Sequence, residues 1–168
     1  GAVMAVGYFY DMPIGRMYIS EDGTGISEVT LINKENEEYY LKNFIIEETE
    51  LIKKAATQLK EYFEGKRKEF NIRLNPKGTP FQKKVWDALL KIPYGETRSY
   101  KDIAIAVGNP KACRAVGMAN HNNPIMCIIP CHRVIGSDGS LTGYGGGIEI
   151  KEKLLTLEKM YYGKEENL

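Results

Sequence analysis

Residues 99–116 read SYKDIAIAVGNPKACRAV, and their pattern indicates how the second half of the chain is built. Ser99 followed by Asp102 is a helix-start pattern, and Gly108 marks the end of the short helix that it begins. After the Gly-Asn turn, Pro110 begins a second helix, because proline suits the first turn of a helix. Two short helices joined by a tight turn predict a helix-turn-helix.

Further helices and turns flank this pair. A capping box with proline at the first helical position predicts a helix of about 80–91, with an apolar stripe formed by Phe81, Val85, Trp86 and Leu89. After the pair, the apolar run at residues 125–129 predicts a strand, and residues 137–140 predict a turn. A last helix is predicted from its apolar residues Leu154, Leu155 and Leu157. The second half is therefore mainly helical.

The first third of the chain alternates apolar and polar residues in the manner of strands. The alternating residues are Val6, Tyr8 and Tyr10, then Met17 and Ile19, then Ile26, Val29 and Leu31. We expect a small antiparallel sheet, followed by an amphipathic helix of about 47–64. The α+β fold predicted in this way has an N-terminal α/β domain over residues 1–72, a linker over residues 73–79 and a C-terminal domain over residues 80–168.

Length, charge and cysteine content limit the classes of protein. The chain has 168 residues, 43% of them hydrophobic and 27% charged, and no apolar run approaches the ~20 residues of a membrane helix. We therefore expect a folded protein without a membrane segment or signal peptide. The formal net charge of +1 excludes a strongly basic nucleic-acid binder. Three cysteines, an odd number, favour a reducing compartment, and hence the cytoplasm, over a disulfide framework.

Cys131 lies beside His132 and Arg133, in the sequence IPCHRV at residues 129–134. A neighbouring imidazole or guanidinium stabilises the thiolate, which is the nucleophilic form of cysteine. From these residues alone, a nucleophilic Cys131 and a buried structural cysteine remain equal alternatives, because free cysteines are often buried in cores. Zinc binding is a weaker alternative, because no second ligand pair accompanies the candidate ligands Cys127, Cys131, His121 and His132.

The chain resembles the O6-alkylguanine-DNA alkyltransferases, whose active-site motif is IPCHRV. Residues 129–134 match this motif letter for letter. Further matching segments, in the family's order, are Gly78–Gln82, Val85-Trp86, Ile92–Thr97, Ser99-Tyr100, Gly108–Ala112, Arg114–Gly117, Asn123-Pro124, Gly143-Tyr144, Gly146-Gly147, Lys151, Leu154-Leu155 and Glu158. The match is dense over residues 73–158 and looser over the first strands, through Pro13-Ile14-Gly15. Several separated motifs in the same order make the resemblance specific.

This resemblance implies a ribonuclease-H-like N-terminal domain, a winged helix-turn-helix C-terminal domain, and repair of alkylated DNA by a single-use transfer. Cys131 would accept the alkyl group, and Glu158 would orient the imidazole of His132. His132 would remove the thiol proton through a bound water, since neighbouring residues of a strand point apart. Tyr100 would donate a hydrogen bond to N3 of the guanine. Asn123 would tie the chain before the active site to the helix-turn-helix. From local sequence, Asn123 equally fits an Asx turn, and Glu158 fits a solvated surface charge.

The resemblance also implies how DNA is bound. The partner would be double-stranded DNA that carries O6-alkylguanine, with O4-alkylthymine as a second candidate lesion, and a monomer would bind it through the minor groove with the damaged base flipped out. Arg114 would fill the space of the flipped base. The other expected DNA-binding residues are Lys101, Lys111, Ala112, Arg133 and Gly145. Gly145 stands where many members carry serine, so only its backbone N–H would remain as a donor.

No cofactor and no metal are expected. Displacement at the alkyl carbon by a thiolate needs no cofactor. The zinc site of human-type members uses cysteine and histidine residues of the N-terminal domain, and no cysteine or histidine precedes Cys113 here. Cys113 departs from the small apolar residue expected beside Arg114, and we interpret it as a packing residue.

Three other functions compete with alkyl transfer. A non-catalytic binder of alkylated DNA, of the alkyltransferase-like kind, would carry tryptophan or another residue in place of Cys131. A Cys-His hydrolase would leave the helix-turn-helix without a purpose. A winged-helix transcription factor is disfavoured by the low net charge and by the reactive motif.

Overall fold

The computed structural model describes residues 5–142 and 147–168, and the chain divides into two compact units. The first unit comprises residues 1–76 and 166–168, and the second comprises residues 77–165. In the first unit, the Asn167 N–H donates to the Lys66 carbonyl at 3.1 Å, which joins the end of the chain to it. Within the described residues, every helix is too short or too polar to span a membrane.

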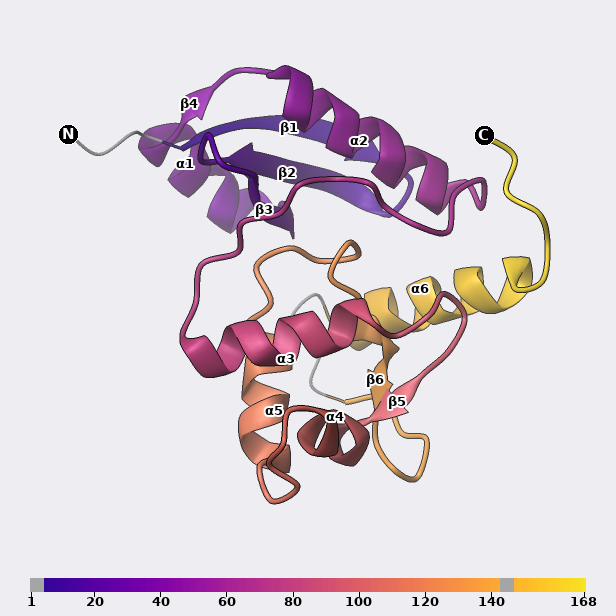
Figure 1. Cartoon of the computed structure of the whole chain (residues 1–168). Coiled ribbons are helices and arrows are strands. Elements are labelled where there is room, and N and C mark those ends of the chain that lie inside the picture. The colour runs from indigo at the N-terminus through magenta and orange to yellow at the C-terminus, as the bar shows by residue number, and fades with distance from the viewer. Residues whose placement is uncertain (1–4, 143–146) are drawn as a thin grey trace. The chain divides into compact units, whose positions relative to one another are not determined.

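The first unit is built on a four-stranded sheet with the strand order β3-β2-β1-β4 (Figure 1). Its strands are β1 (Val6–Met12), β2 (Gly15–Glu21), β3 (Ile26–Leu31) and β4 (Ile45–Ile46). β2 pairs antiparallel with both β1 and β3, as the alternation predicts. The short strand β4 joins β1 in parallel, which makes the sheet mixed.

Two helices cover this sheet, α1 (Lys34–Asn43) and α2 (Glu50–Phe63). α2 agrees with the helix expected over 47–64, whereas α1 is not predicted, because its mostly exposed sequence lacks an apolar stripe. The rings of Tyr18 and Tyr40 lie 4.3 Å apart, which places α1 on the face to which Tyr18 points. Neighbouring strand residues point to opposite faces, so Met17 points to the other face. Because both faces are covered, the central part of β2 is buried without alternation.

The second unit is mainly helical (Figure 1). Its elements are α3 (Pro80–Leu90), β5 (Arg98–Ser99), α4 (Tyr100–Ala106), α5 (Cys113–His121), the one-turn 3-10 helix η1 (Cys131–Arg133), β6 (Val134–Ile135) and α6 (Ile148–Tyr161). The predicted capping boxes are present at the starts of α3 and α4. β5 pairs in parallel with β6. This pairing brings the start of α4 next to the segment that follows Cys131.

α4 and α5 form the predicted pair of helices. α5 begins at Cys113, later than predicted, because a turn precedes it in which the Ala112 N–H donates to the Asn109 carbonyl at 3.0 Å. The indole N–H of Trp86 donates to the Ala119 carbonyl at 2.9 Å inside the core, which fixes α3 against α5.

The strand predicted at residues 125–129 is wrong. The segment forms consecutive turns, with the Ile129 N–H donating to the Ile125 carbonyl at 3.1 Å. Cys127 has a φ of 69°, in the left-handed region, which an extended strand does not allow. All five residues are buried, and a short apolar run predicts burial without distinguishing a strand from another buried conformation. Cys131 and its neighbours consequently lie in η1 and not in a strand.

Candidate active site

Cys131 is the first residue of η1 and is only 4% exposed. The side-chain amide of Asn123 donates to Cys131 Sγ at 3.0 Å and to the Ile129 carbonyl at 2.9 Å. The amide of Asn120, near the end of α5, donates to the Cys131 carbonyl at 3.2 Å. Two asparagines at the end of the helix-turn-helix therefore hold both the sulfur and the backbone of Cys131.

Asn120 is not among the site residues expected from the sequence. It lies four residues after the buried Val116 on the same face of α5, and it is 1% exposed. A polar side chain on an apolar helix face was a detectable signal, because buried amides need hydrogen-bond partners. The partner, the carbonyl of Cys131, depends on the tertiary fold.

His132 and Arg133 both bind Glu158, which α6 brings to them. His132 Nε2 lies 2.6 Å from one carboxylate oxygen of Glu158. Arg133 donates to both carboxylate oxygens, at 2.8 and 3.1 Å. The Gly95 N–H adds a further hydrogen bond to Glu158 at 3.0 Å. The three side chains are buried, and the structure brings together this predicted pair of His132 and Glu158.

The charges of this cluster determine its protonation states. Burial alone would raise the pKa of Glu158, but its bonds to His132 and Arg133 lower the pKa to about 2. Burial lowers the pKa of His132 below its ordinary value, against the opposing effect of Glu158. The imidazole is therefore neutral at pH 7. Because its Nε2 faces a carboxylate, the proton sits on Nε2, and Nδ1 is the basic nitrogen.

Arg133 is not placed where a DNA-contact residue is expected. It is 6% exposed, and besides Glu158 it donates to the Ile92 carbonyl at 2.7 Å. A guanidinium bound in this way would have to leave a buried carboxylate in order to reach a phosphate, which is unfavourable. The sequence pattern shows a cation beside the nucleophile, but only the tertiary fold supplies the carboxylate that binds it.

Cys127 is a second buried cysteine, four residues before Cys131. Burial raises the pKa of the Cys127 thiol well above its ordinary value, and Cys131 adds to the effect. Cys127 therefore stays protonated and unreactive at neutral pH. None of the three described cysteines forms a disulfide.

A groove of about 630 Å³ runs along the helix-turn-helix. It is lined by Tyr100, Cys113, Arg114, Gly117, Met118, His121 and Thr142. Tyr100 is the first residue of α4, and its hydroxyl donates to the Thr142 carbonyl at 2.8 Å. Arg114 is exposed in the first turn of α5. The structure thus places Tyr100 and Arg114 in one accessible groove.

The other expected DNA-binding residues lie near the turn between α4 and α5. Lys101 and Lys111 are exposed, and Lys101 Nζ donates to the Pro110 carbonyl at 2.9 Å. Ala112 lies in the turn itself. Gly145 lies outside the described residues.

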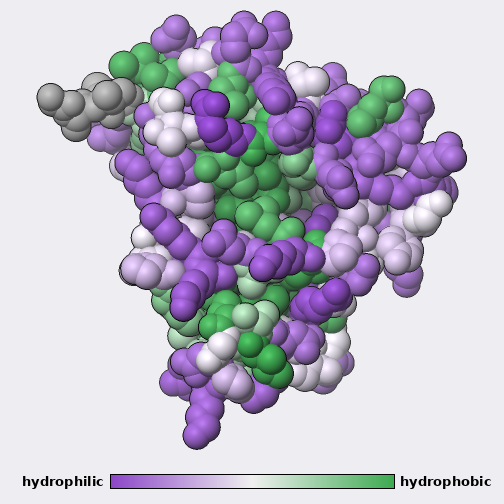
Figure 2. Space-filling view, in the orientation of Figure 1, coloured by the Kyte–Doolittle hydropathy of each residue, from purple (hydrophilic) through white to green (hydrophobic). Residues whose placement is uncertain are grey.

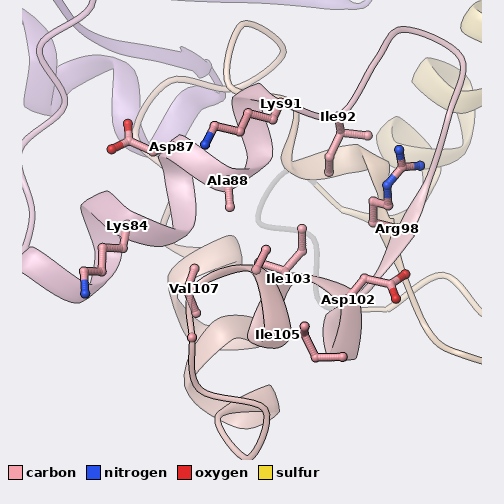
Figure 3. A pocket seen from close by; sticks show the side chains of 12 residues that line it. Lys84, Asp87, Ala88, Lys91, Ile92, Arg98, Asp102, Ile103, Ile105 and Val107 are labelled. Atoms are coloured by element: carbon pink, nitrogen blue, oxygen red, sulfur yellow. The ribbon is translucent and has the colours of Figure 1, made fainter.

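A second groove, of about 730 Å³, lies between α3 and α4 (Figure 3). Ala88, Ile103 and Val107 lie in its middle, and Lys84 and Arg98 lie at opposite ends. Figure 2 shows a hydrophobic patch over α4, in keeping with the 54% exposure of Ile105. The groove is lined neither by Cys131 nor by the residues that bind it, so it is separate from the candidate active site.

The candidate zinc ligands are not assembled into a site. Among residues 5–142 and 147–168, no group of three or more histidine, cysteine, aspartate or glutamate side chains is placed to hold a metal ion. The Cys131 sulfur instead accepts a hydrogen bond from the Asn123 amide.

Both units match one protein family. The ribonuclease-like domain of 6-O-methylguanine DNA methyltransferase matches residues 6–76, and the DNA-binding domain of the same protein matches residues 80–160. This chain belongs to the 6-O-methylguanine DNA methyltransferase family. The resemblance inferred from IPCHRV is therefore confirmed, and so is the α+β fold.

Relatives in this methyltransferase family align over almost the whole chain. The methylated-DNA–protein-cysteine methyltransferase of Methanosarcina barkeri is 49% identical over 154 residues, which are 90% of this chain and 97% of the relative. The constitutive enzyme of Bacillus subtilis is 48% identical over 155 residues, 90% of this chain and 94% of the relative.

Solved structures of methyltransferases from Mycobacterium tuberculosis share the fold. The O6-methylguanine methyltransferase has a TM-score of 0.87 and 44% identity, over 96% of this chain and 97% of that one. The same organism's OGT in complex with DNA has a TM-score of 0.84 and 44% identity, over 93% of this chain and 94% of that one.

Proposed function

We propose that this protein repairs DNA by direct reversal, moving an alkyl group from O6 of guanine to its own Cys131. The activity is that of a methylated-DNA–protein-cysteine methyltransferase. The observation that carries the assignment to Cys131 is the position of its sulfur, 3.0 Å from the Asn123 amide donor and next in sequence to the neutral His132. The thiol of Cys127, by contrast, has a pKa that burial raises well above its ordinary value.

The first step is formation of the thiolate. His132 accepts the thiol proton at Nδ1 through a water molecule, since two neighbouring residues of a 3-10 helix do not face each other. Glu158 holds the ring and stabilises the imidazolium that forms, as the carboxylate does in other activated nucleophiles. Arg133 keeps Glu158 ionised and in place, which is a positioning role. The Asn123 N–H stabilises the negative sulfur.

The second step is displacement at the alkyl carbon. A bond forms between Cys131 Sγ and the carbon, and the bond from the carbon to O6 breaks, so that its electron pair stays with the guanine. The hydroxyl of Tyr100 donates to N3 and stabilises this negative charge. The product is a thioether, which cellular reductants do not cleave, so each molecule acts once. The displacement requires no cofactor.

The DNA partner is double-stranded and carries O6-alkylguanine. Because Cys131 is only 4% exposed, a base within the helical stack does not reach its sulfur, and the base must be flipped out. Arg114, exposed at the start of α5, fills the gap in the stack from the minor groove. Lys101, Lys111 and Ala112 contact the backbone around the turn of the helix-turn-helix. The protein binds as a monomer in the cytoplasm, where a reducing environment keeps its cysteines reduced.

Mass spectrometry after incubation with excess O6-methylguanine duplex DNA tests this proposal. One methyl group should be added per chain, on the peptide that contains Cys131, and the reaction should then stop. Cys131→Ser should bind the lesion and accept no methyl group, because a serine hydroxyl is a poor nucleophile without strong activation. Cys113→Ser and Cys127→Ser are the matched controls and should react normally. Repeated turnover, or label on Cys113 or Cys127 in the folded protein, would contradict the proposal.

A further inference from the structure

Lys151 is a buried cation that the mechanism above does not use. It lies on the buried face of α6 and is 0% exposed. Its ammonium group donates to the Val134 carbonyl at 2.5 Å and to the Thr142 carbonyl at 2.9 Å. Burial lowers the pKa of Lys151, because an ammonium group loses its hydration there. An apolar side chain would fill the same space without this cost of desolvation. What distinguishes Lys151 from such a side chain is its two hydrogen bonds to carbonyl oxygens.

The Thr142 carbonyl is shared by two donors. It accepts from the Tyr100 hydroxyl at 2.8 Å as well as from Lys151. A carbonyl oxygen has two lone pairs and can accept both bonds, whereas a tyrosine hydroxyl has a single proton to donate. Tyr100 therefore cannot donate to Thr142 and to a guanine at the same time. Donation to the base requires that the bond between Tyr100 and Thr142 breaks.

Lys151 determines what remains after this bond breaks. With Lys151 in place, the Thr142 carbonyl keeps one hydrogen bond when Tyr100 turns to the base. Without Lys151, the carbonyl would lose both of these bonds at the moment when an incoming base displaces water from the groove. An unsatisfied polar group is unfavourable once water is excluded. The hydrogen bond from the Tyr100 hydroxyl to the Thr142 carbonyl would then compete with the bond from the same hydroxyl to the base.

The second contact of Lys151 fixes its position relative to the active site. Val134 directly follows η1, whose residues His132 and Arg133 are bound by Glu158. Lys151 and Glu158 lie two turns apart on the buried face of α6. α6 therefore holds the segment that follows Cys131 at two points. The ammonium group of Lys151 is fixed against this segment by Val134, and the same group also reaches the Thr142 carbonyl.

We propose that Lys151 is a positioning residue that keeps the Thr142 carbonyl satisfied and thereby releases the Tyr100 hydroxyl to bind the extruded guanine. This inference rests on the proposed function, in which Tyr100 donates to the base. Lys151 does not touch the substrate in this scheme. It acts through Thr142 on the availability of the Tyr100 proton.

A double-mutant cycle tests the inference. Lys151→Met and Tyr100→Phe are made singly and together, and single-turnover methyl transfer from O6-methylguanine duplex DNA is measured for each. With Tyr100 present, Lys151→Met should slow transfer by about tenfold or more, the effect of losing one compensating hydrogen bond. In the Tyr100→Phe background there is no hydroxyl to release, so the same substitution should slow transfer by less than about threefold.

A merely structural role of Lys151 would slow transfer by the same factor in both backgrounds, and this result would overturn the inference. An unchanged rate for Lys151→Met would also overturn it. Lys153→Met, at an exposed position of the same helix, is the matched control and should react at the wild-type rate. If Lys151→Met does not fold, as judged by its thermal unfolding, Lys151→Gln is compared in the same two backgrounds with the same criterion. The wild-type protein separates the two proposals, because failure to methylate Cys131 there contradicts the proposed function itself.

Discussion

His132 Nε2 lies 2.6 Å from Glu158 Oε2, and both side chains are buried. Arg133 binds the same carboxylate, so one negative charge is shared by a cation and a neutral imidazole. This arrangement keeps Glu158 ionised while leaving His132 available as a base. The stability and the pH dependence of the protein should both follow from it.

Glu158→Gln should destabilise the protein by about 3–5 kcal/mol, because it leaves Arg133 as a buried, uncompensated charge. It should also slow methyl transfer, since the imidazolium loses its partner. Urea unfolding and single-turnover kinetics measure the two effects. Glu152→Gln, at an exposed position of the same helix, should change neither. If Glu158→Gln loses no more stability than Glu152→Gln, the contacts of Glu158 with His132 and Arg133 contribute nothing to the free energy of unfolding.

The unfolding free energy of the wild type should fall as the pH is lowered below neutrality. His132 has a lowered folded pKa, so its contribution is present above its ordinary value of 6.5 and is lost below it. Glu158 has a folded pKa of about 2 and an ordinary value of 4.5, so its contribution is present above 4.5 and is lost as the pH falls towards 2. Unfolding curves from pH 8 to pH 3 check this. In Glu158→Gln, the loss below pH 4.5 should be reduced.

The rate of methyl transfer should remain high at pH 6.5. A histidine with its ordinary pKa would be half protonated there, but the lowered pKa of His132 keeps the base neutral. When single-turnover rates are measured between pH 5 and pH 8, the decrease in rate on the acid side, the acid limb, should therefore be centred below pH 6.5. An acid limb centred at 6.5 or higher would argue against His132 as the base.

Tyr100→Phe should slow transfer by about tenfold to a thousandfold and leave lesion binding within a few-fold, because it removes a donor used in the transition state. The ring is retained, so packing in the groove is preserved. Single-turnover kinetics and fluorescence anisotropy measure the two quantities. Tyr39→Phe, at a 55% exposed position of the first unit, is the control. An unchanged rate for Tyr100→Phe would remove Tyr100 from the mechanism.

Arg114→Ala should slow repair of duplex DNA more than reaction with free O6-alkylguanine base, because only duplex repair requires base extrusion. Lys111→Ala should instead weaken duplex binding. It should also reduce the slope of log K against log salt concentration by about the amount expected for one phosphate contact. The comparison of the two substrates for both variants separates the roles. Equal losses on duplex and free base would exclude extrusion as the function of Arg114.

Methylation of Cys131 should lower the melting temperature. Sγ lies 3.0 Å from the Asn123 amide in a buried site, so an added methyl group must displace this donor. Overpacking of this kind costs about 1–3 kcal/mol. Calorimetry of the methylated and unmethylated proteins gives the difference, and equal melting temperatures would show that the site accommodates the methyl group without strain.

The starts of α3 and α4 are predictable from the sequence, because a capping box is a local structure. Thr79 with Gln82 and Ser99 with Asp102 bond within four residues of chain, so the letters alone specify them. The candidate nucleophile Cys131 is likewise identified by local sequence, since IPCHRV is contiguous. The apolar run at 125–129 predicts burial but not the left-handed turn at Cys127, because hydrophobicity does not specify the backbone conformation.

The local sequence specifies which residues are candidates for the chemistry, their order along the chain, and where α3 and α4 begin. Only the packing of distant elements shows that Arg133 binds Glu158, that Asn120 holds the Cys131 carbonyl, and that Lys151 shares the Thr142 carbonyl with Tyr100. Arg133 and Glu158 lie 25 residues apart, and Tyr100 and Thr142 lie 42 apart. A capping pattern needs only neighbours in the chain, whereas a buried charge or carbonyl takes whichever partner the packing of distant elements brings within hydrogen-bond distance.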